Sequence, residues 1–404
     1  MMSYTKGTKK KYKNTSYFSH DYIIANHGDI VSFIAMVIVI GLMFQVTAPV
    51  SKLFTMLQHN VTIRSNQASM QDTVNRVGTL YTAGYRDLLT CLFYTLIAIV
   101  IHAVVQEYII DRLYKRLHFS KSQYGKISEI SQLLLFYLIS FLWGANIVYK
   151  ERLLASISTL WTGYPHLYLS FWFKFYFICQ ICYWLHCFPE LYFQRVSPSE
   201  MPERGQRYAI NLLCIAGAYL LNLNRIAVVL LVLHYLAEII FHCSRLLRLA
   251  GRRSAAWYGF ALWDLVFVAV RLFSVALAGL TFALGLEKNS RDRISIREGN
   301  FNTKFIRLNC LAVVCLLQGY LMWNFITFHV RKARQFLETH TDVQQVVSHE
   351  RCLIRSIGQD NKPSAARLSA VLEDRQSNSR EPTAVKCTSG LNRCSELRQR
   401  RMVQ

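Results

Sequence analysis

The feature that most constrains this chain is a series of apolar blocks of membrane-spanning length, joined by short polar connectors. About 20 consecutive apolar residues are enough for a helix to cross the hydrocarbon core of a bilayer. The pattern predicts an all-α polytopic membrane protein, a bundle of eight transmembrane helices. The expected spans are residues 30–46, 88–110, 130–149, 167–188, 208–221, 226–241, 260–286 and 308–328.

Basic connectors set the expected orientation of these spans. Five lysines precede the first span, and arginines and lysines follow the second, fourth and sixth spans. Because cytosolic loops carry an excess of Lys and Arg, both chain termini are expected in the cytosol. The connector between the seventh and eighth spans disagrees: it is expected in the lumen, yet its six basic residues outnumber its three acidic ones. The basic residues there are Lys288, Arg291, Arg293, Arg297, Lys304 and Arg307.

The formal net charge of +22 fits a membrane protein whose connectors touch anionic lipid or ribosomal surfaces. No recognised base-reading motif is present, so sequence-specific nucleic-acid binding is not expected.

Two N-glycosylation sequons lie on opposite sides of the first span, at Asn14 and at Asn60. Only one of these sides can face the lumen. The lysines before the first span favour Asn60, which is therefore the expected glycosylation site.

Several polar residues fall inside the expected spans, where an unpaired charge costs about 2.5–3.5 kcal/mol even on the lenient insertion scale. Two alternatives remain open. The residues form hydrogen bonds between helices, worth about 0.6 kcal/mol each on average, or they line a polar groove open to the cytosol. The residues of the candidate groove are His102, Gln106, Glu107, His186, His234, Glu238, His242, Asp264 and Arg271.

The most regular polar pattern is His234, Glu238 and His242. On a helix these residues fall within an arc of about 80°, with a rise of roughly 6 Å between neighbours. The stripe could supply half of a metal site or an acid–base pair, but no second half is evident and His-Glu-x-x-His is absent. No Gly-rich phosphate loop and no Gly-x-Ser-x-Gly turn is present, so no catalytic and no metal residues are expected. Pro189 is expected to end the fourth span.

Four long blocks resemble the translocating chain-associated membrane protein family. They are IHAVVQEYIIDRLYKRLHFSK (101–121), YWLHCFPELYFQ (183–194), IAGAYLLNLNRIAVVLLVLHYLAE (215–238) and GNFNTKFIR (299–307). Asn60 also falls where the lumenal sequon of that family lies. The resemblance covers residues 18–329, and the tail beyond differs from the lysine-rich tail of the family.

The resemblance implies a multi-pass protein of the endoplasmic-reticulum membrane with eight spans and both termini in the cytosol. It implies an accessory of the protein-conducting channel, one that contacts signal sequences and transmembrane segments near the lateral gate and assists translocation or insertion. The ribosome and a phospholipid are further possible partners. Apart from a bound phospholipid, no cofactor is expected. The expected domains are a cytosolic tail (1–29), two helices with a glycosylated loop (30–117), a six-helix TLC-like domain (118–329) and a basic tail (330–404), part amphipathic helix and then disordered.

The same superfamily includes ceramide synthases, so a lipid-modifying enzyme or a lipid-binding protein is the alternative. Members with that activity carry two adjacent histidines and downstream aspartates, whereas no two histidines are adjacent here. The sequence therefore favours a protein that is not an enzyme.

Overall fold

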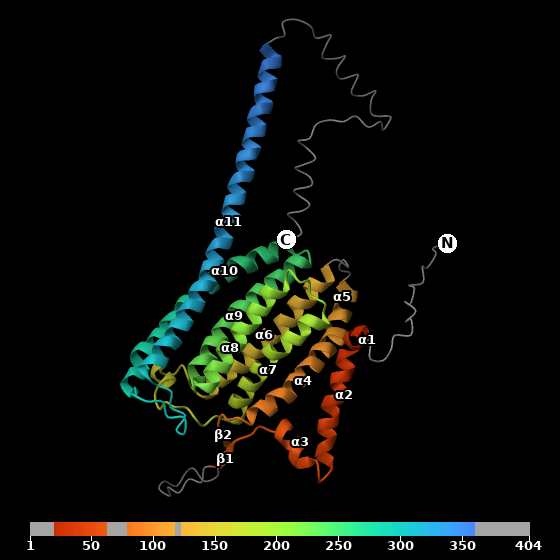
Figure 1. Cartoon of the computed structure of the whole chain (residues 1–404). Helices are drawn as coiled ribbons and strands as arrows, with labels where there is room; N and C mark the ends of the chain where they lie inside the picture. The colour runs from red at the N-terminus through yellow and green to blue at the C-terminus, as the bar shows by residue number, and fades with distance from the viewer. Residues whose placement is uncertain (1–19, 63–78, 118–122, 360–404) are drawn as a thin grey trace, which may run out of the picture. The chain divides into compact units, whose positions relative to one another are not determined.

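The computed structural model describes residues 20–62, 79–117 and 123–359, and within them the chain is mostly helical (Figure 1). The helices are α1 (His20–Ala25), α2 (His27–Ile40), α3 (Ala48–Thr55), α4 (Asp87–Val104), α5 (Asp111–Leu117), α6 (Tyr124–Lys150), α7 (Phe171–Phe193), α8 (Met201–Leu220), α9 (Asn224–Leu249), α10 (Arg253–Gly279) and α11 (Lys304–Gln359). Two π-helical segments, η2 (Val105–Ile110) and η5 (Leu280–Gly285), extend α4 and α10. A short antiparallel hairpin pairs β1 (Asn60–Thr62) with β2 (Thr79–Tyr81).

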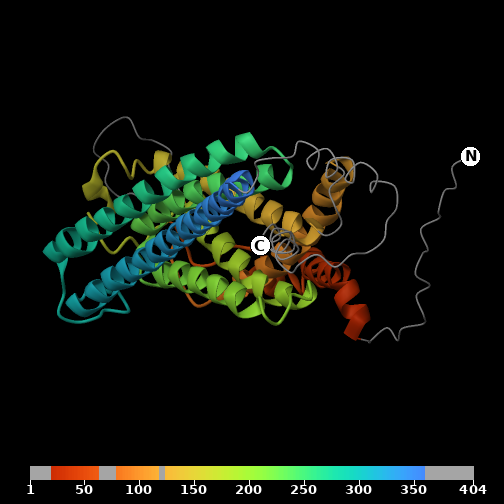
Figure 2. The ribbon, with the colours of Figure 1, turned by 90° about the horizontal axis from the view of Figure 1, so that it is seen from above.

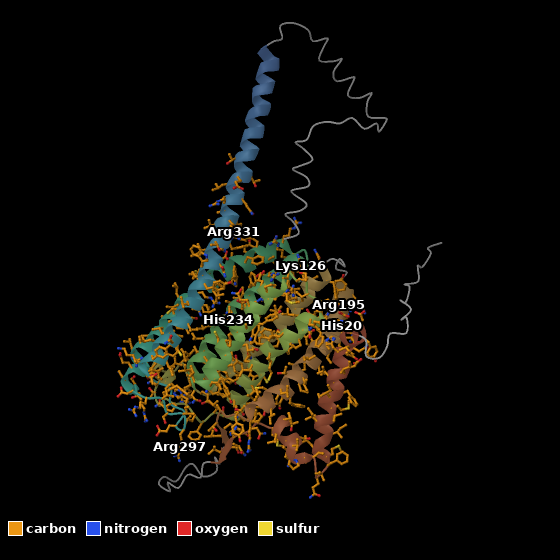
Figure 3. The ribbon with its side chains drawn as sticks, viewed as in Figure 1. His20, Lys126, Arg195, His234, Arg297 and Arg331 are labelled. Atoms are coloured by element: carbon orange, nitrogen blue, oxygen red, sulfur yellow. The ribbon has the colours of Figure 1, made fainter. Side chains whose placement is uncertain are left out.

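The long helices from α2 to α10 run alternately in opposite directions, so the bundle has two ends (Figure 1). One end holds α1 and the connectors after α7 and α9, and we call it the N-terminal end. The other holds β1, β2 and the connectors after α6, α8 and α10, and we call it the hairpin end. Figure 3 shows Lys126 and Arg195 at the N-terminal end and Arg297 at the hairpin end.

A helix occupies each of the eight segments expected to cross the membrane. Among the residues that the structure describes, five helical stretches are long and apolar enough to do so: 87–116, 124–150, 224–249, 253–289 and 304–339. The apolar helix 27–43 is shorter, and α7 and α8 carry more polar residues. The multi-pass helical architecture is thus confirmed, whereas the number of eight crossings stays a prediction.

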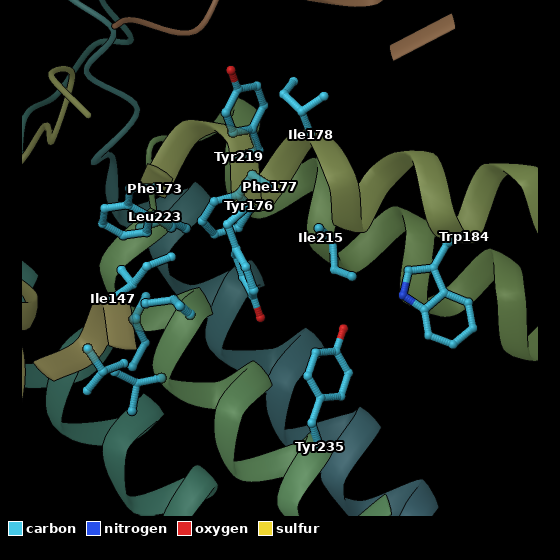
Figure 4. Close-up of a cluster of buried hydrophobic side chains, with 14 of the residues drawn as sticks. Ile147, Phe173, Tyr176, Phe177, Ile178, Trp184, Ile215, Tyr219, Leu223 and Tyr235 are labelled. Carbon is cyan, nitrogen blue, oxygen red and sulfur yellow. The ribbon is translucent and has the colours of Figure 1, made fainter. Parts of the chain in front are cut away.

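α7 lies at the centre of the bundle, packed between α4 and α8, while α9 packs between α6 and α10. The core is aromatic: Tyr176, Phe177 and Trp184 of α7 are fully buried, together with Tyr235 of α9 (Figure 4). Because protein surrounds α7, several of its polar side chains find partners within the bundle. Lys174, Gln180 and His186 are examples, all of them buried. A helix in this position does not need the apolar composition of one that faces lipid.

The connector between α2 and α4 is fastened to the bundle at the hairpin end. The ammonium group of Lys174 lies 2.6 Å from a carboxylate oxygen of Asp87, and it donates to the backbone carbonyls of Gln58 and Thr82 at 2.8 Å. The Tyr219 hydroxyl donates to the other Asp87 oxygen at 2.8 Å. A residue expected inside the fourth span therefore joins this connector to α4, α7 and α8.

The prediction that Pro189 ends the fourth helix is wrong. α7 begins at Phe171 and continues through Pro189 to Phe193. Proline removes only one backbone donor, and the packed neighbours of α7 supply enough stabilisation to carry the helix one turn further. The fifth helix is also longer than the sequence indicated, since α8 begins at Met201 and includes the polar turn with Arg204 and Arg207.

The contacts divide the chain into two units, residues 1–324 and 325–404. In the second unit the helix α11 continues to Gln359, so the first part of the expected tail is helical. Its amphipathic position on a membrane stays a prediction. The expected disorder after residue 360, the lysines of the N-terminal tail and the sequon at Asn14 lie outside the described residues.

Candidate functional site

The candidate groove residues of α4 and α7 meet near the N-terminal end of the bundle. His102 Nδ1 lies 3.4 Å from His186 Nε2, and His102 Nε2 lies 3.3 Å from Glu190 Oε1. Gln194 joins them, since its amide nitrogen lies 3.0 Å from His102 Nε2 and donates to Glu190 Oε1 at 3.1 Å. We call these four residues the His102 cluster.

Glu190 is the acidic residue of this cluster. Its side chain is 8% exposed, and its second oxygen, Oε2, has no hydrogen-bond partner among the described residues. A ring nitrogen of His27 on α2, Nε2, lies 4.0 Å from Oε2. A buried carboxylate oxygen without a donor is costly, so this position favours a hydrogen-bond donor or a cation.

A small cavity adjoins the His102 cluster and is lined also by Glu129, Gln132, Arg204 and Tyr208. Its volume, about 30 Å³, is enough for one or two ordered water molecules. A larger ligand would have only its end group inside. Arg204 also lines the cavity, and two carboxylates already pair with it, Glu129 at 2.9 Å and Glu200 at 2.8 Å.

Gln106 lies in the π-helical segment η2 and connects α4 to the start of α6. Its amide nitrogen donates to Asp111 Oδ1 at 3.1 Å and to the Tyr124 hydroxyl at 2.6 Å. Its carbonyl oxygen accepts from Ser128 and, at 3.3 Å, from Gln132. The π-helical turn fits this arrangement, because an extra residue in the turn changes the direction of the side chains that follow. Gln106 therefore acts in interhelical hydrogen bonding, the first of the two alternatives for the polar residues.

Residues of α9, α10 and α11 form a second group, the His234 cluster. Its members are His234, Glu238 and His242 of α9, Arg271 of α10 and Gln318 of α11. The Arg271 guanidinium lies 3.0 Å from His234 Nδ1 and donates to Gln318 Oε1 at 2.9 Å. Glu238 lies 3.8 Å from His234 and 3.6 Å from His242, so the stripe read from the sequence is present. Two buried nitrogens, Arg271 Nε and His242 Nδ1, have no hydrogen-bond partner in the part of the chain that the structure describes.

The two clusters are separate, and an aromatic layer lies between them. Tyr183 packs near His186, with ring centroids 4.8 Å apart, and stacks face to face on Phe136. On the other side of α6, the ring of Tyr137 lies 5.5 Å from that of His242. Seen from above, α2 and α10 lie toward opposite sides of the bundle (Figure 2). The geometry gives two polar sites instead of one continuous groove.

The remaining candidate residues lie outside the two clusters. Glu107 is exposed on the outer side of η2. Asp264 is half-buried two turns from Arg271, and Arg271 bonds to His234 and Gln318 instead. Asn60 is exposed in β1 at the hairpin end.

Sequence reasoning missed Glu190 and Gln194, although the sequence holds a signal for them. His186, Glu190 and Gln194 repeat every four residues, as do His234, Glu238 and His242. The wrong prediction that the helix ends at Pro189 placed Glu190 and Gln194 outside the helix. For that reason their shared helix face with His186 was not recognised.

No group of three or more His, Cys, Asp or Glu residues is placed to hold a metal ion among the residues described. The chemistry available in both clusters is hydrogen bonding and charge pairing in a low-dielectric setting, where both are stronger than in water.

Comparison with known proteins identifies relatives of this chain. A family model described as the TLC domain matches residues 126–327. The human translocating chain-associated membrane protein 2 is 38% identical over 382 residues, which are 95% of this chain and 96% of that protein. The mouse protein of the same name is 40% identical over 338 residues, 84% of this chain and 89% of that protein. A more distant relative is ceramide synthase 4 of cattle, 25% identical over 254 residues, 60% of this chain and 61% of that enzyme.

Proposed function

Because the chain belongs to the translocating chain-associated membrane protein family, with a TLC domain over residues 126–327, we propose that it is an accessory of the protein-conducting channel of the endoplasmic reticulum. In this proposal it contacts signal sequences and transmembrane segments near the lateral gate and assists their translocation or insertion. Both termini face the cytosol, and the ribosome is a further partner. The similarity over nearly the full length of the human relative carries the proposal.

The His234 cluster supplies a physical basis for such an activity. His234 and Glu238 are 22% and 21% exposed, so these polar side chains are not sealed within the bundle. A nascent segment with few apolar residues, or with a charge at its flank, is penalised in lipid. Hydrogen-bonding groups at membrane depth would lower that penalty while the segment lies beside the bundle.

The test is photocrosslinking of a stalled nascent chain that carries a weakly hydrophobic signal sequence. Microsomes containing the full-length protein are expected to give an adduct at intermediate chain lengths. The variant Glu238→Gln with Arg271→Gln is expected to lower its yield, whereas the matched change Glu107→Gln, on an exposed carboxylate outside both clusters, leaves it unchanged. If no adduct forms at any chain length, the proposal is wrong.

The unpartnered oxygen of Glu190 favours a second function, the binding of a phospholipid. A lipid headgroup with an ammonium group, entering from the open side of the cavity, would place a donor against Glu190 Oε2. Native mass spectrometry of the purified protein is expected to show a retained phospholipid. Glu190→Gln should lose it and Glu107→Gln should keep it; equal retention in both variants would contradict the assignment.

We propose no enzymatic activity for either cluster. The chain has no adjacent histidine pair, and the cavity at the His102 cluster is far smaller than an acyl-CoA. A lipid-modifying enzyme that uses His234 and Glu238 would lose product formation in the variant His234→Ala. Cells that carry this variant are expected to keep an unchanged lipid profile.

A further inference from the structure

The basic connector between α10 and α11 is an ordered structure, which we call the basic loop (residues 287–303). The Asn302 side chain donates to the carbonyls of Leu286 and Asn289 at 2.7 and 3.0 Å. Ser295 and Asn300 exchange two backbone hydrogen bonds of 3.0 Å. Asn222, in the turn between α8 and α9, donates to the carbonyl of Gly299 at 2.9 Å and fixes the loop to the bundle.

The tip of the basic loop holds two apolar residues that the fold leaves uncovered. Ile294 and Ile296 are 51% and 81% exposed. Burying an isoleucine side chain stabilises a protein by about 1.5–3 kcal/mol relative to leaving it exposed. Here two exposed isoleucines lie within one stretch of three residues in an ordered loop. An ordered loop with an apolar tip indicates a partner that covers the tip.

Cations surround this tip. Two acidic residues of the connector are already paired: Glu298 with Arg291 at 2.8 Å, and Glu287 with Arg307 at 3.4 Å. Lys288, Arg293, Arg297 and Lys304 form no ion pair with any residue that the structure describes, and all four are exposed. Only Asp292 remains to balance them, so the surface around Ile294 and Ile296 is basic.

The basic loop lies at the hairpin end of the bundle, as the position of Arg297 shows (Figure 3). It leads directly into α11, whose first turns already expose Phe305 and Leu308. At the same end of the bundle, Tyr149 and Trp172 are exposed at 82% and 58%. Exposed Tyr and Trp side chains at helix ends are typical of the headgroup region of a bilayer.

We propose that the basic loop is an interfacial anchor that inserts into the adjacent leaflet. Ile294 and Ile296 enter the upper acyl region, and Arg293 and Arg297 bind phosphates of lipid headgroups, preferentially of anionic lipids. Apolar residues flanked by arginines match a membrane surface, in which hydrocarbon chains lie beneath a layer of anionic headgroups. The excess charge of the connector then serves lipid binding, and no change in the number of spans is needed to explain it. This inference does not depend on the proposed function.

The experiment places the photoreactive residue benzoylphenylalanine at position 296 of the full-length protein. The protein is reconstituted in nanodiscs of phosphatidylcholine with a minor share of phosphatidylserine, irradiated and analysed by mass spectrometry. Lipid adducts are expected at position 296, with phosphatidylserine enriched above its share of the bilayer. The same residue at Ser290, an exposed polar position at the base of the loop, is expected to give few lipid adducts.

Substitution of the arginines then distinguishes binding of lipid headgroups at the basic loop from a nonspecific attraction between the basic protein and anionic lipid. Arg293→Gln with Arg297→Gln is expected to reduce the enrichment of phosphatidylserine by roughly fivefold for each arginine. Lys150→Gln with Arg152→Gln removes two exposed cations from the same end and is expected to leave it unchanged. The proposal is overturned if position 296 gives no lipid adduct, if irradiated microsomes give protein adducts there instead, or if both charge variants act alike.

Discussion

The ammonium group of Lys174 shows how tertiary contacts decide what a polar residue in an apolar chain does. It is fully buried and makes three hydrogen bonds, one of them to the carboxylate of Asp87. Tyr219 and the backbone N–H of Gly84 also donate to the carboxylate of Asp87. Every charge is met by a partner, so the pair stabilises one arrangement of the connector, α4, α7 and α8 at the hairpin end.

Replacing Lys174 by Met should destabilise the folded protein by about 3–5 kcal/mol, because it leaves the Asp87 carboxylate buried without its cation. Thermal unfolding of the detergent-solubilised protein measures the change. Adding Asp87→Asn to the same chain is expected to recover part of the loss, since an amide costs less to bury than a carboxylate. A single variant as stable as the unmodified protein would mean that water reaches this pair.

His166, in the connector between α6 and α7, is a source of pH dependence. Burial, together with the nearby Arg225, lowers the pKa of His166 to about 4, and one ring nitrogen lies 3.1 Å from the Thr162 carbonyl. The unfolded chain, with a pKa near 6.5, binds a proton more readily in the window between these values. The stability that His166 contributes is therefore complete above pH 6.5 and is lost as the pH falls toward 4.

Between pH 7 and pH 5 the loss from His166 should amount to about 2 kcal/mol. Melting temperatures of the purified protein at the two pH values, compared with those of His166→Gln, measure it. The variant is expected to show a smaller drop on acidification. An unchanged drop would assign the pH dependence to other groups.

At the scale of elements, the bundle depends on close approach of helices at small residues. Gly144 of α6 faces both α9 and α7: a Cβ at this position would lie 2.7 Å from a methyl group of Val232 and 3.1 Å from the Tyr176 hydroxyl. Both neighbours are held within the packed interior. A side chain at position 144 must therefore push α6 away from the centre of the bundle.

Gly144→Ala is expected to destabilise the protein by about 1–3 kcal/mol through this overpacking. Gly217→Ala on α8 is the matched control, because a Cβ there meets no atom within 4 Å. That control should be neutral or stabilising by up to about 1 kcal/mol, as alanine favours a helix over glycine. Thermal unfolding of both variants distinguishes packing from helix propensity, and equal effects would argue against a tight contact at Gly144.

At the scale of the whole molecule, the alternation of α2 to α10 places β1 and the basic loop at the same end (Figure 1). If that end faces the lumen, Asn60 and the loop are both accessible to the glycosylation machinery. The side of the membrane on which Asn60 and the basic loop lie therefore determines the number of crossings and the orientation of the termini.

Expression in microsomes should give a single glycan on Asn60, removed by endoglycosidase and absent in Asn60→Gln. A second sequon, carried on a flexible Gly/Ser insertion after Ser290, should add a second glycan. Glycosylation at Asn60 without glycosylation at the insertion would place the basic loop in the cytosol and contradict eight crossings.

The sequence by itself determined the class of fold, the positions of the long helices and the family. Blocks of about 20 apolar residues have few stable structures in lipid other than helices, and long matching stretches fix a family without any coordinates. The stripe of His234, Glu238 and His242 was also readable, because residues four apart share a helix face.

Only the tertiary structure decided which polar residues meet. Packing carried α7 through Pro189 and so brought Glu190 and Gln194 to His102, two residues that the sequence placed beyond the helix. It also inserted the rings of Phe136, Tyr137 and Tyr183 between the two clusters, which divided the predicted groove. Helical periodicity gives the face on which a residue lies, but the partner opposite that face depends on how helices distant in sequence pack together.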